Sequence, residues 1–126
     1  MKHLILPISI FIFVISLICT NQIILKNLTN TLENDIDTIE KLVENEDFEK
    51  SIPLMKEFSE KYTKYNSYFS AVVRHNELDE IRLLVKRLEA YNKSADKVMF
   101  LAESNALKDM LCHIYKLDTI NIENIL

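Results

Sequence analysis

The residues of this chain with the clearest potential for chemistry lie in the segment HNELDEI, residues 75–81. His75 and Asp79 are four residues apart, which on a helix places two side chains on one face and lets both bind one metal ion. His113, next to Cys112 in a later segment, would supply a further ligand from a second helix. The segment lacks the HExxH and CxxC signatures of zinc sites. A metal-binding or metal-sensing domain that uses His75, Asp79 and His113 is therefore a secondary hypothesis, and we expect neither a metal site nor a cofactor.

The same segment also has the composition of a helix start. Asn76 is a good N-cap residue, and Glu77 and Asp79 would lie near the positive end of the helix dipole. Asn76-x-x-Asp79 resembles a capping box with Asp in place of Glu. His75 would then be a boundary residue that is hydrogen-bonded to Asp79 or to a carbonyl of a neighbouring helix. We prefer this structural role, and a partner-binding surface is the remaining alternative.

The cysteine and serine side chains lack the surroundings that catalytic nucleophiles need. Cys112 and His113 are adjacent, so on a helix they point about 100° apart, which is wrong for a thiolate–imidazole pair. The serines lack the strand-turn-helix elbow of hydrolases, and about a hundred helical residues leave little room for a cleft lined by paired carboxylates. We therefore expect no catalytic residues and a protein that is not an enzyme.

Composition argues against two classes of partner. The chain has no Gly, so neither GxGxxG nor a phosphate-binding P-loop can be present, which argues against a nucleotide site of either kind. The formal net charge is −4, and the longest basic cluster is Lys86-Arg87. A nucleic-acid binder would be expected to carry a basic patch, so nucleic acid is not an expected partner either.

The N-terminal segment predicts a membrane anchor. Residues 4–25 contain no charged side chain, and as a helix they would span roughly 33 Å, enough for the hydrocarbon core of a bilayer. The alternative is a cleaved signal peptide, since Lys2 and His3 form a basic start, but a small-x-small cleavage site is missing and Ile18 is a poor residue before a lipoprotein Cys19. Lys2 and the α-amino group precede the span, and Lys26 is the first cation after it, so the positive-inside rule gives a small preference for an N-terminus in the cytoplasm. The sequence therefore predicts a single-pass protein of the cytoplasmic membrane with its N-terminus inside.

Residues 26–126 are predicted to form an extracytoplasmic helical domain, after a short tail at 1–3 and the span at 4–25. Apolar residues recur at steps of three and four from Leu28 to Val43, from Leu54 to Val73, from Leu78 to Tyr91 and from Val98 to Ile114. Asn30 with Glu33 predicts the start of the first of these helices. Asp118-Thr119 predicts a break before an extended or turn-like tail that docks through Ile120, Ile122 and Leu126. The fold class is therefore all-α: an N-terminal transmembrane helix followed by a small antiparallel bundle of three to four helices.

Two surfaces of these helices have a distinctive composition. Residues 31–60 hold ten acidic side chains against three basic ones, and we expect the acids at 33, 35, 37, 40, 44 and 46 to form a solvated outer face. Aromatic residues at helical spacing, namely Tyr62, Tyr65, Tyr68 and Phe69, are expected to lie in the core. The two cysteines, Cys19 and Cys112, are too differently placed to predict a disulfide.

The whole pattern resembles a family of short membrane proteins from clostridia and related spore-forming bacteria, domain of unknown function 4363. The most specific pieces are DFEKS at residues 47–51, HNELDEI at 75–81 and INIENIL at 120–126. The resemblance covers nearly the full chain and implies a bacterial envelope protein with an all-helical domain. It carries over no reaction, ligand or catalytic residue.

Together these features predict an uncharacterised membrane-anchored helical module of the bacterial cell envelope. We expect it to contact the membrane through residues 4–25 and to act by protein–protein association, with an unknown partner or with itself. Two alternatives stay open: the metal-binding domain described above, and a secreted helical protein released by signal-peptide cleavage.

Overall fold

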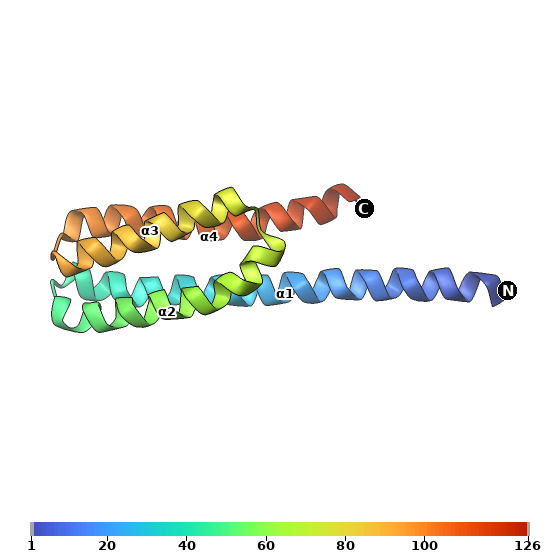
Figure 1. Ribbon diagram of the computed structural model, residues 1–126, viewed down its shortest axis with the longest axis horizontal. Coiled ribbons are helices and arrows are strands. Elements are labelled where there is room, and N and C mark those ends of the chain that lie inside the picture. The colour runs from blue at the N-terminus through green and yellow to red at the C-terminus, as the bar shows by residue number, and fades with distance from the viewer. Residues whose placement is uncertain (1, 126) are drawn as a thin grey trace.

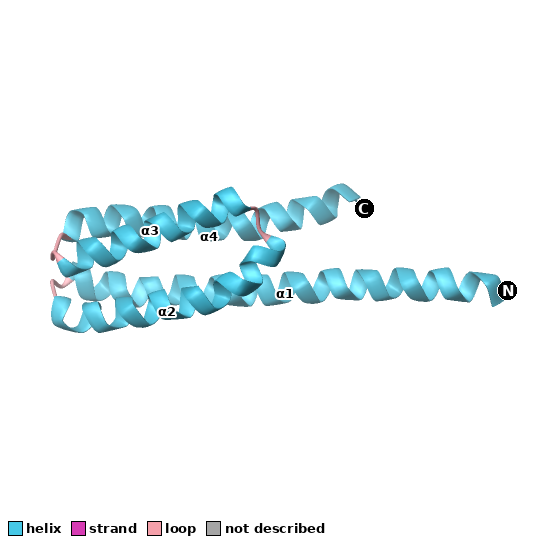
Figure 2. Ribbon diagram, in the orientation of Figure 1, coloured by secondary structure: helices cyan, strands magenta, loops and turns pink. Residues whose placement is uncertain are grey.

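The protein is a bundle of four antiparallel helices, shown by a computed structural model that describes the backbone of residues 2–125 and the side chains of residues 2–114 (Figures 1 and 2). The helices are α1 (Lys2–Glu44), α2 (Phe48–Val72), α3 (His75–Lys93) and α4 (Lys97–Ile125). Each helix packs on two neighbours: α1 and α3 both contact α2 and α4. The predicted all-α, up-and-down bundle is therefore confirmed, with four helices.

The apolar periodicity of the sequence explains the core. On every helix the buried residues recur at steps of three and four, so one stripe of each helix faces the bundle axis. The core consists of these side chains: Leu25, Leu32, Ile36, Ile39, Val43, Met55, Phe58, Tyr62, Phe69, Leu78, Ile81, Val85, Leu88, Phe100, Leu107, Leu111 and Ile114. Burial of aliphatic side chains of this size contributes about 1.5–3 kcal/mol each, which holds the four helices together.

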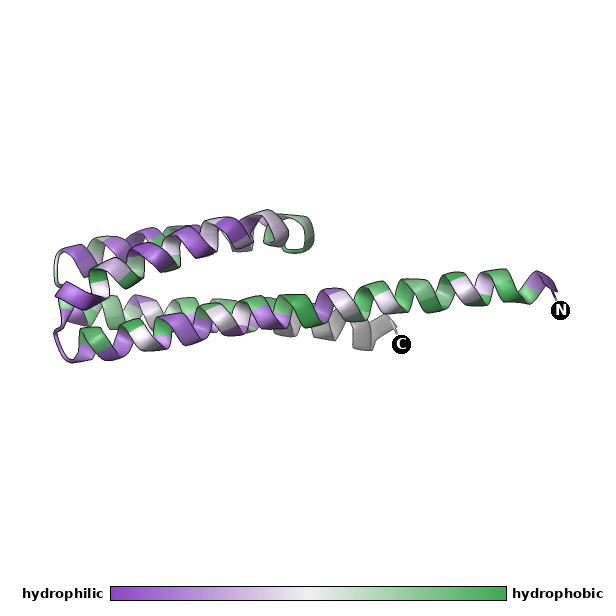
Figure 3. Cartoon of the chain, turned by 90° about the horizontal axis from the view of Figure 1, so that it is seen from below, coloured by the Kyte–Doolittle hydropathy of each residue, from purple (hydrophilic) through white to green (hydrophobic). Residues whose placement is uncertain are grey.

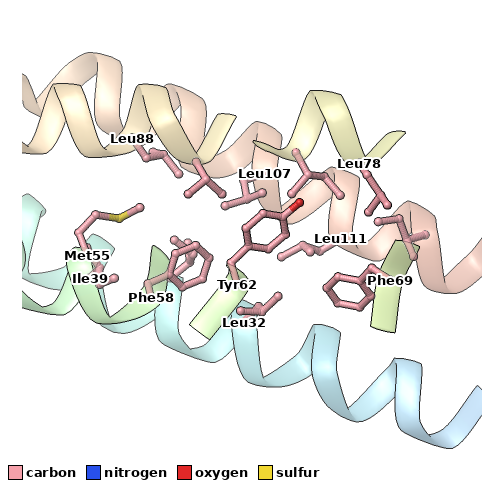
Figure 4. Close-up of a cluster of buried hydrophobic side chains, with 14 of the residues drawn as sticks. Leu32, Ile39, Met55, Phe58, Tyr62, Phe69, Leu78, Leu88, Leu107 and Leu111 are labelled. Atoms are coloured by element: carbon pink, nitrogen blue, oxygen red, sulfur yellow. The ribbon is translucent and has the colours of Figure 1, made fainter. Parts of the chain in front are cut away.

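Of the aromatic stripe predicted in the core, Tyr62 and Phe69 are buried there, whereas Tyr65 and Tyr68 are partly buried and pack against it. Phe69 is fully buried and contacts the rings of Tyr62, Tyr65 and Tyr68, with ring centroids 6.4–6.5 Å apart. Figure 4 shows Phe58, Tyr62 and Phe69 pointing from α2 into the space between the helices. The Tyr65 and Tyr68 rings meet Phe69 edge-to-face, which adds a favourable contact within α2 to the burial of Phe69.

The predicted helix start at Asn30 is wrong, because α1 is one continuous helix from Lys2 to Glu44. Asn costs only a few tenths of a kcal/mol inside a helix, and the chain on both sides is strongly helix-forming, so no new N-terminus forms there. The first half of α1 projects beyond the other helices (Figure 1), and most of its exposed side chains are apolar (Figure 3). The bundle and the apolar segment therefore share one rigid element.

The two turns at the end of the bundle away from the N-terminus are tight and similar. Glu46 and Ala95 adopt left-handed backbone conformations, with φ of 58° and 56°. At each turn the last residue before the next helix donates its N–H to a carbonyl five residues earlier, from Asp47 to Leu42 and from Asp96 to Tyr91. This is the Schellman motif, which normally places Gly at the left-handed position. A chain without Gly uses Glu and Ala there instead.

Asp47 and Asp96 then begin the next helices. The Asp47 side chain accepts a hydrogen bond from the N–H of Lys50, and Asp96 accepts one from the N–H of Met99. These bonds satisfy amides that have no partner within the helix. Asp47 and Asp96 are therefore the residues that cap the N-termini of α2 and α4.

Two other predicted helix boundaries are wrong. Arg74, in extended conformation, precedes α3 without a side-chain cap, and the helix begins at His75, so Asn76 lies within it and no capping box with Asp79 forms. At the other end of the chain, α4 continues past Asp118 and Thr119 to Ile125. Both residues are only mildly unfavourable in a helix and no Pro or Gly follows them, so nothing stops propagation. The predicted docking contacts of Ile120, Ile122 and Leu126 lie outside the side chains that the structure describes.

Candidate functional site

The segment HNELDEI does not assemble a site with its predicted companions. His75, Asp79 and His113 are all exposed, and the Asp79 carboxylate accepts a hydrogen bond of 3.0 Å from the Arg82 guanidinium on the same helix. Within the part of the chain that the structure describes, no group of three or more His, Cys, Asp or Glu residues is placed to hold a metal ion. The second hypothesis, a metal site on these residues, therefore gains no further ligand.

The acidic residues of α1 are not a uniformly solvated face. Lys61 of α2 reaches Asp35 at 2.5 Å, and Lys108 of α4 donates hydrogen bonds to Glu40 at 2.8 Å and to Asp37 at 3.1 Å. Three of the acids expected at the outer surface thus turn toward cations of neighbouring helices. The periodicity of α1 places them at the edge of the buried stripe, where long side chains of adjacent helices reach them.

This ion-pair network shifts the pKa of its members. The hydrogen bond to Glu40 raises the pKa of Lys108, and the hydrogen bond to Asp35 raises that of Lys61. Partial burial, with the Asp37 carboxylate nearby, raises the pKa of Glu33. Ser104, which is fully buried, donates a hydrogen bond of 2.6 Å to Glu40 and so holds that carboxylate against α4. The network ties α1 to α4 at the middle of the bundle.

A buried polar pair links α2 to α3. Ser51 in the first turn of α2 donates a hydrogen bond of 2.7 Å to Asn92 Oδ1 in the last turn of α3, and both residues are at most 1% exposed. The Asn92 Nδ2 group has no hydrogen-bond partner among the described residues. A buried amide donor without a partner costs about 1–3 kcal/mol of stability. Asn92 is therefore unfavourable for stability on this side of its amide group.

A groove lies beside this pair, between α2 and α3. The groove has a volume of about 510 Å³, within the usual range for small-ligand sites. Its floor includes Met55 and Asn92, and its rims carry Lys56 and Glu60 from α2 and Glu89 and Lys93 from α3. In the described part of the structure none of these four charged groups takes part in an ion pair.

Sequence reasoning missed this groove, although the spacing contained a signal. Asn92 lies four residues after Leu88, on the buried stripe of α3. Ser51 likewise lies four residues before Met55 on the stripe of α2. A polar residue on an apolar stripe is expected to find a buried partner, and the two stripes face one another.

A second polar contact joins the bundle to the apolar half of α1. Tyr68, near the end of α2, donates its hydroxyl to the side-chain carbonyl of Asn21. Asn21 therefore contacts the bundle, and Leu25, one turn further along α1, is fully buried. The part of α1 before this contact, Lys2 to Thr20, is exposed and about 28 Å long.

One helix of the described chain, α1, is long and apolar enough to cross a membrane, and its most apolar 18-residue window has no buried residue. Signal sequences share this length and composition. The two cysteines are free, with Cys19 exposed on this helix and Cys112 half-buried on α4.

Comparison with known proteins gives one family. No curated protein and no solved structure matches the chain. Residues 19–125 match the family described as Domain of unknown function (DUF4363). The match covers α1 from Cys19 onward and the whole of α2, α3 and α4, so it leaves out most of the apolar first half of α1. The chain therefore belongs to the DUF4363 family.

Proposed function

We propose that this protein is a single-span, membrane-anchored helical module of the bacterial cell envelope that acts by association with another protein or with a second copy of itself. In this proposal the N-terminus lies on the cytoplasmic side of the cytoplasmic membrane, and the bundle lies on the extracytoplasmic side. The observation that carries the proposal is the continuity of α1, whose exposed apolar half passes without a break into the bundle core.

The energetics of α1 support the anchor. Side chains such as Phe11, Ile12 and Phe13 are more than 60% exposed, and no element of the described chain covers them. An apolar surface of this length is unfavourable in water and favourable in a bilayer. The roughly 28 Å between Lys2 and Thr20 are close to the thickness of the hydrocarbon core, so Tyr68 would lie at the interface, where Tyr is enriched.

The distal tip of the bundle supports association. Val98 and Met99, in the first turn of α4, are 76% and 38% exposed. Lys97 donates a hydrogen bond of 2.9 Å to the carbonyl of Glu44, which fixes this turn against the end of α1. Exposed apolar side chains on a rigid turn are typical of contact surfaces, because little entropy is lost when a partner covers them.

Photo-crosslinking in native membranes tests the proposal. A photoreactive residue in place of Val98 should give a discrete adduct, either with one partner or with a second copy of the chain. The same residue in place of Lys64, an exposed polar position on α2, should give none and serves as the control. Equal diffuse labelling from both positions would count against association through the tip.

A further inference from the structure

The end of the bundle from which α1 projects faces the membrane in the proposed function, and the backbone of α4 ends level with it. Lys108 of α4 donates a hydrogen bond to Asp37 of α1. Continuing this antiparallel register brings the backbone of Ile125, where α4 ends, level with about Thr20, the last residue of the exposed apolar segment. The side chains of α4 beyond Ile114 are not among those described, so only its backbone is placed here.

The turn between α2 and α3 lies at the same end of the bundle (Figure 1). The Tyr68 hydroxyl reaches Asn21, and α2 runs four more residues toward the membrane before it ends at Val72. Val73 and Arg74 then form the turn. Since Asn21 directly follows the exposed apolar segment, and since the headgroup layer on each side of a bilayer core is about 5–7 Å thick, the turn stands at the level of the lipid headgroups.

Arg74 is the charged residue of this turn. Its side chain is exposed and takes part in no ion pair among the described residues. No acidic residue occurs in residues 61–76 or in the first 32 residues of the chain. A guanidinium group presents planar N–H donors that match two oxygens of one phosphate. A lipid phosphate is the anion that lies at this level.

The acidic residues that follow on α3 lie farther from the membrane. The helix runs away from the bilayer at ~1.5 Å per residue, so Asp79 and Glu80 are about 7–9 Å farther out than Arg74. The Asp79 carboxylate is paired with Arg82 on the same helix. Glu77, the nearest acid along the chain, is half-buried. The exposed charge of the turn itself is therefore positive.

We propose that the α2–α3 turn is a second membrane contact, in which Arg74 binds the phosphate of a lipid and holds this side of the bundle against the bilayer. Val72 and Val73, both half-buried, add apolar surface to the contact. Membrane-spanning helices tilt by about 20° on average, and because α1 is continuous, its tilt moves the whole bundle. The contact at the turn sets the direction of that tilt. It rests on the membrane span of the proposed function, but on neither its orientation nor association through the distal tip.

The contact also sets the height of the distal tip. Helix α2, from Phe48 to Val72, has 25 residues. A helix of this length is about 37 Å long. Val98 and Met99, at the end of the bundle away from the turn, are therefore held roughly 35 Å from the headgroups. A partner of the tip has to reach it at that height.

Fluorescence quenching in lipid nanodiscs tests the proposal on the full-length chain. A fluorophore is attached at Ser70→Cys, an exposed position just before the turn, in a chain with Cys19→Ser and Cys112→Ser. The nanodiscs contain phosphatidylglycerol and a small fraction of lipid with a spin label on its headgroup. We expect quenching of this fluorophore, and no quenching when it is attached instead at Ala90→Cys, which is exposed near the other end of α3. Equal quenching at the two positions, or none at either, would overturn the contact.

Substitution of Arg74 separates a phosphate contact from mere proximity. Arg74→Gln should lower the ratio of lipid-contacting to free orientations about fivefold, the factor expected for one cation near an anionic surface. Its thermal melting should be unchanged, since the side chain is exposed. Lys86→Gln, which removes an exposed cation farther along α3, should alter neither quantity. Undiminished quenching in Arg74→Gln would show that the guanidinium group does not hold the turn, and the proposal would be wrong.

A label on α1 distinguishes failure of this contact from failure of the membrane span. A fluorophore at Phe11→Cys, in the middle of the apolar segment, should be quenched by a spin label on the lipid acyl chain. Quenching there without quenching at Ser70→Cys would overturn the turn contact alone. Absence of quenching at Phe11→Cys would overturn the span of the proposed function, and this inference with it.

Discussion

Replacing Lys108 with Met would remove the cation that joins α1 to α4 while keeping the apolar stem of the side chain. Lys108 Nζ lies 2.8 Å from Glu40 and 3.1 Å from Asp37, and its side chain is 28% exposed. The variant leaves Asp37 and Glu40 without their shared cation, with the Glu33 carboxylate nearby. We expect a clear loss of stability, because carboxylates that were paired at the edge of the core become unpaired and repel one another.

The magnitude follows from the two contacts. The hydrogen bond to Glu40, whose side chain is only 13% exposed, is worth about 1.5–2 kcal/mol as a charged pair. The contact with Asp37, which is 50% exposed, adds less than about 1 kcal/mol. A loss of about 2 kcal/mol corresponds to a fall in Tm of roughly 8–16 °C for a bundle of this size. Circular dichroism of the full-length chain in detergent, followed through thermal and urea unfolding, measures it.

The pH dependence of this contribution has a definite sign. The pKa of Lys108 is raised in the folded state, so its contribution is fully present below the ordinary lysine value of 10.5 and is lost as the pH rises through the folded-state pKa. The difference between the wild type and Lys108→Met should therefore shrink in strongly alkaline solution.

Arg82→Met is the matched control, since it also removes one positive charge from an ion pair. Arg82 lies 3.0 Å from Asp79, but the two side chains are 63% and 67% exposed, so the loss should be below about 0.5 kcal/mol. If Lys108→Met were no more destabilising than Arg82→Met, the α1–α4 network would be an incidental surface contact and the reasoning would be refuted.

Three further predictions concern single positions. Ala95→Gly should raise stability by about 1 kcal/mol, since Ala95 has a φ of 56° that Gly adopts without strain, and an unchanged denaturation midpoint would contradict the turn geometry. Glu33→Gln should be more stable than the wild type at pH 7, because the raised pKa of Glu33 means that its ionised form is unfavourable in the folded protein. The gain in stability should disappear well below pH 4.5, where Glu33 is protonated in both the folded and the unfolded chain. A gain that persists at such a pH would contradict this explanation. Tyr62→Phe should be neutral or stabilising by up to about 1 kcal/mol in urea unfolding, because the buried Tyr62 hydroxyl has no partner among the described residues, whereas a loss above 1 kcal/mol would mean that the hydroxyl is bonded.

Much of the fold follows from local patterns in the sequence. The apolar stripes from Leu78 to Leu88 and from Met55 to Phe69 predict which faces are buried, because a period of 3.6 leaves one choice of core face. The helix boundaries at Asn30 and Asp118 were not predictable in this way. Cap-forming residues have only weak preferences, and a continuous helix on both sides overrides them.

The groove could not be predicted from the sequence with its chemistry, because it depends on the pairing of two helices. Ser51 and Asn92 are 41 residues apart, and their contact is set by the register of α2 against α3. The partners of Asp35, Asp37 and Glu40 depend in the same way on which helices are neighbours. Local periodicity places each residue on a face of its own helix, but only the packed bundle determines which faces meet.

The central claim, that α1 remains attached and crosses the membrane with the bundle outside, is tested most directly by labelling a single exposed cysteine in intact cells. Asn105→Cys, on the exposed face of α4, would be introduced into a chain with Cys19→Ser and Cys112→Ser. A membrane-impermeant maleimide should label this position before lysis, on a full-length chain that stays in the membrane fraction. Labelling only after lysis, or labelling of a shorter soluble chain that has lost its first twenty or so residues, would contradict the account.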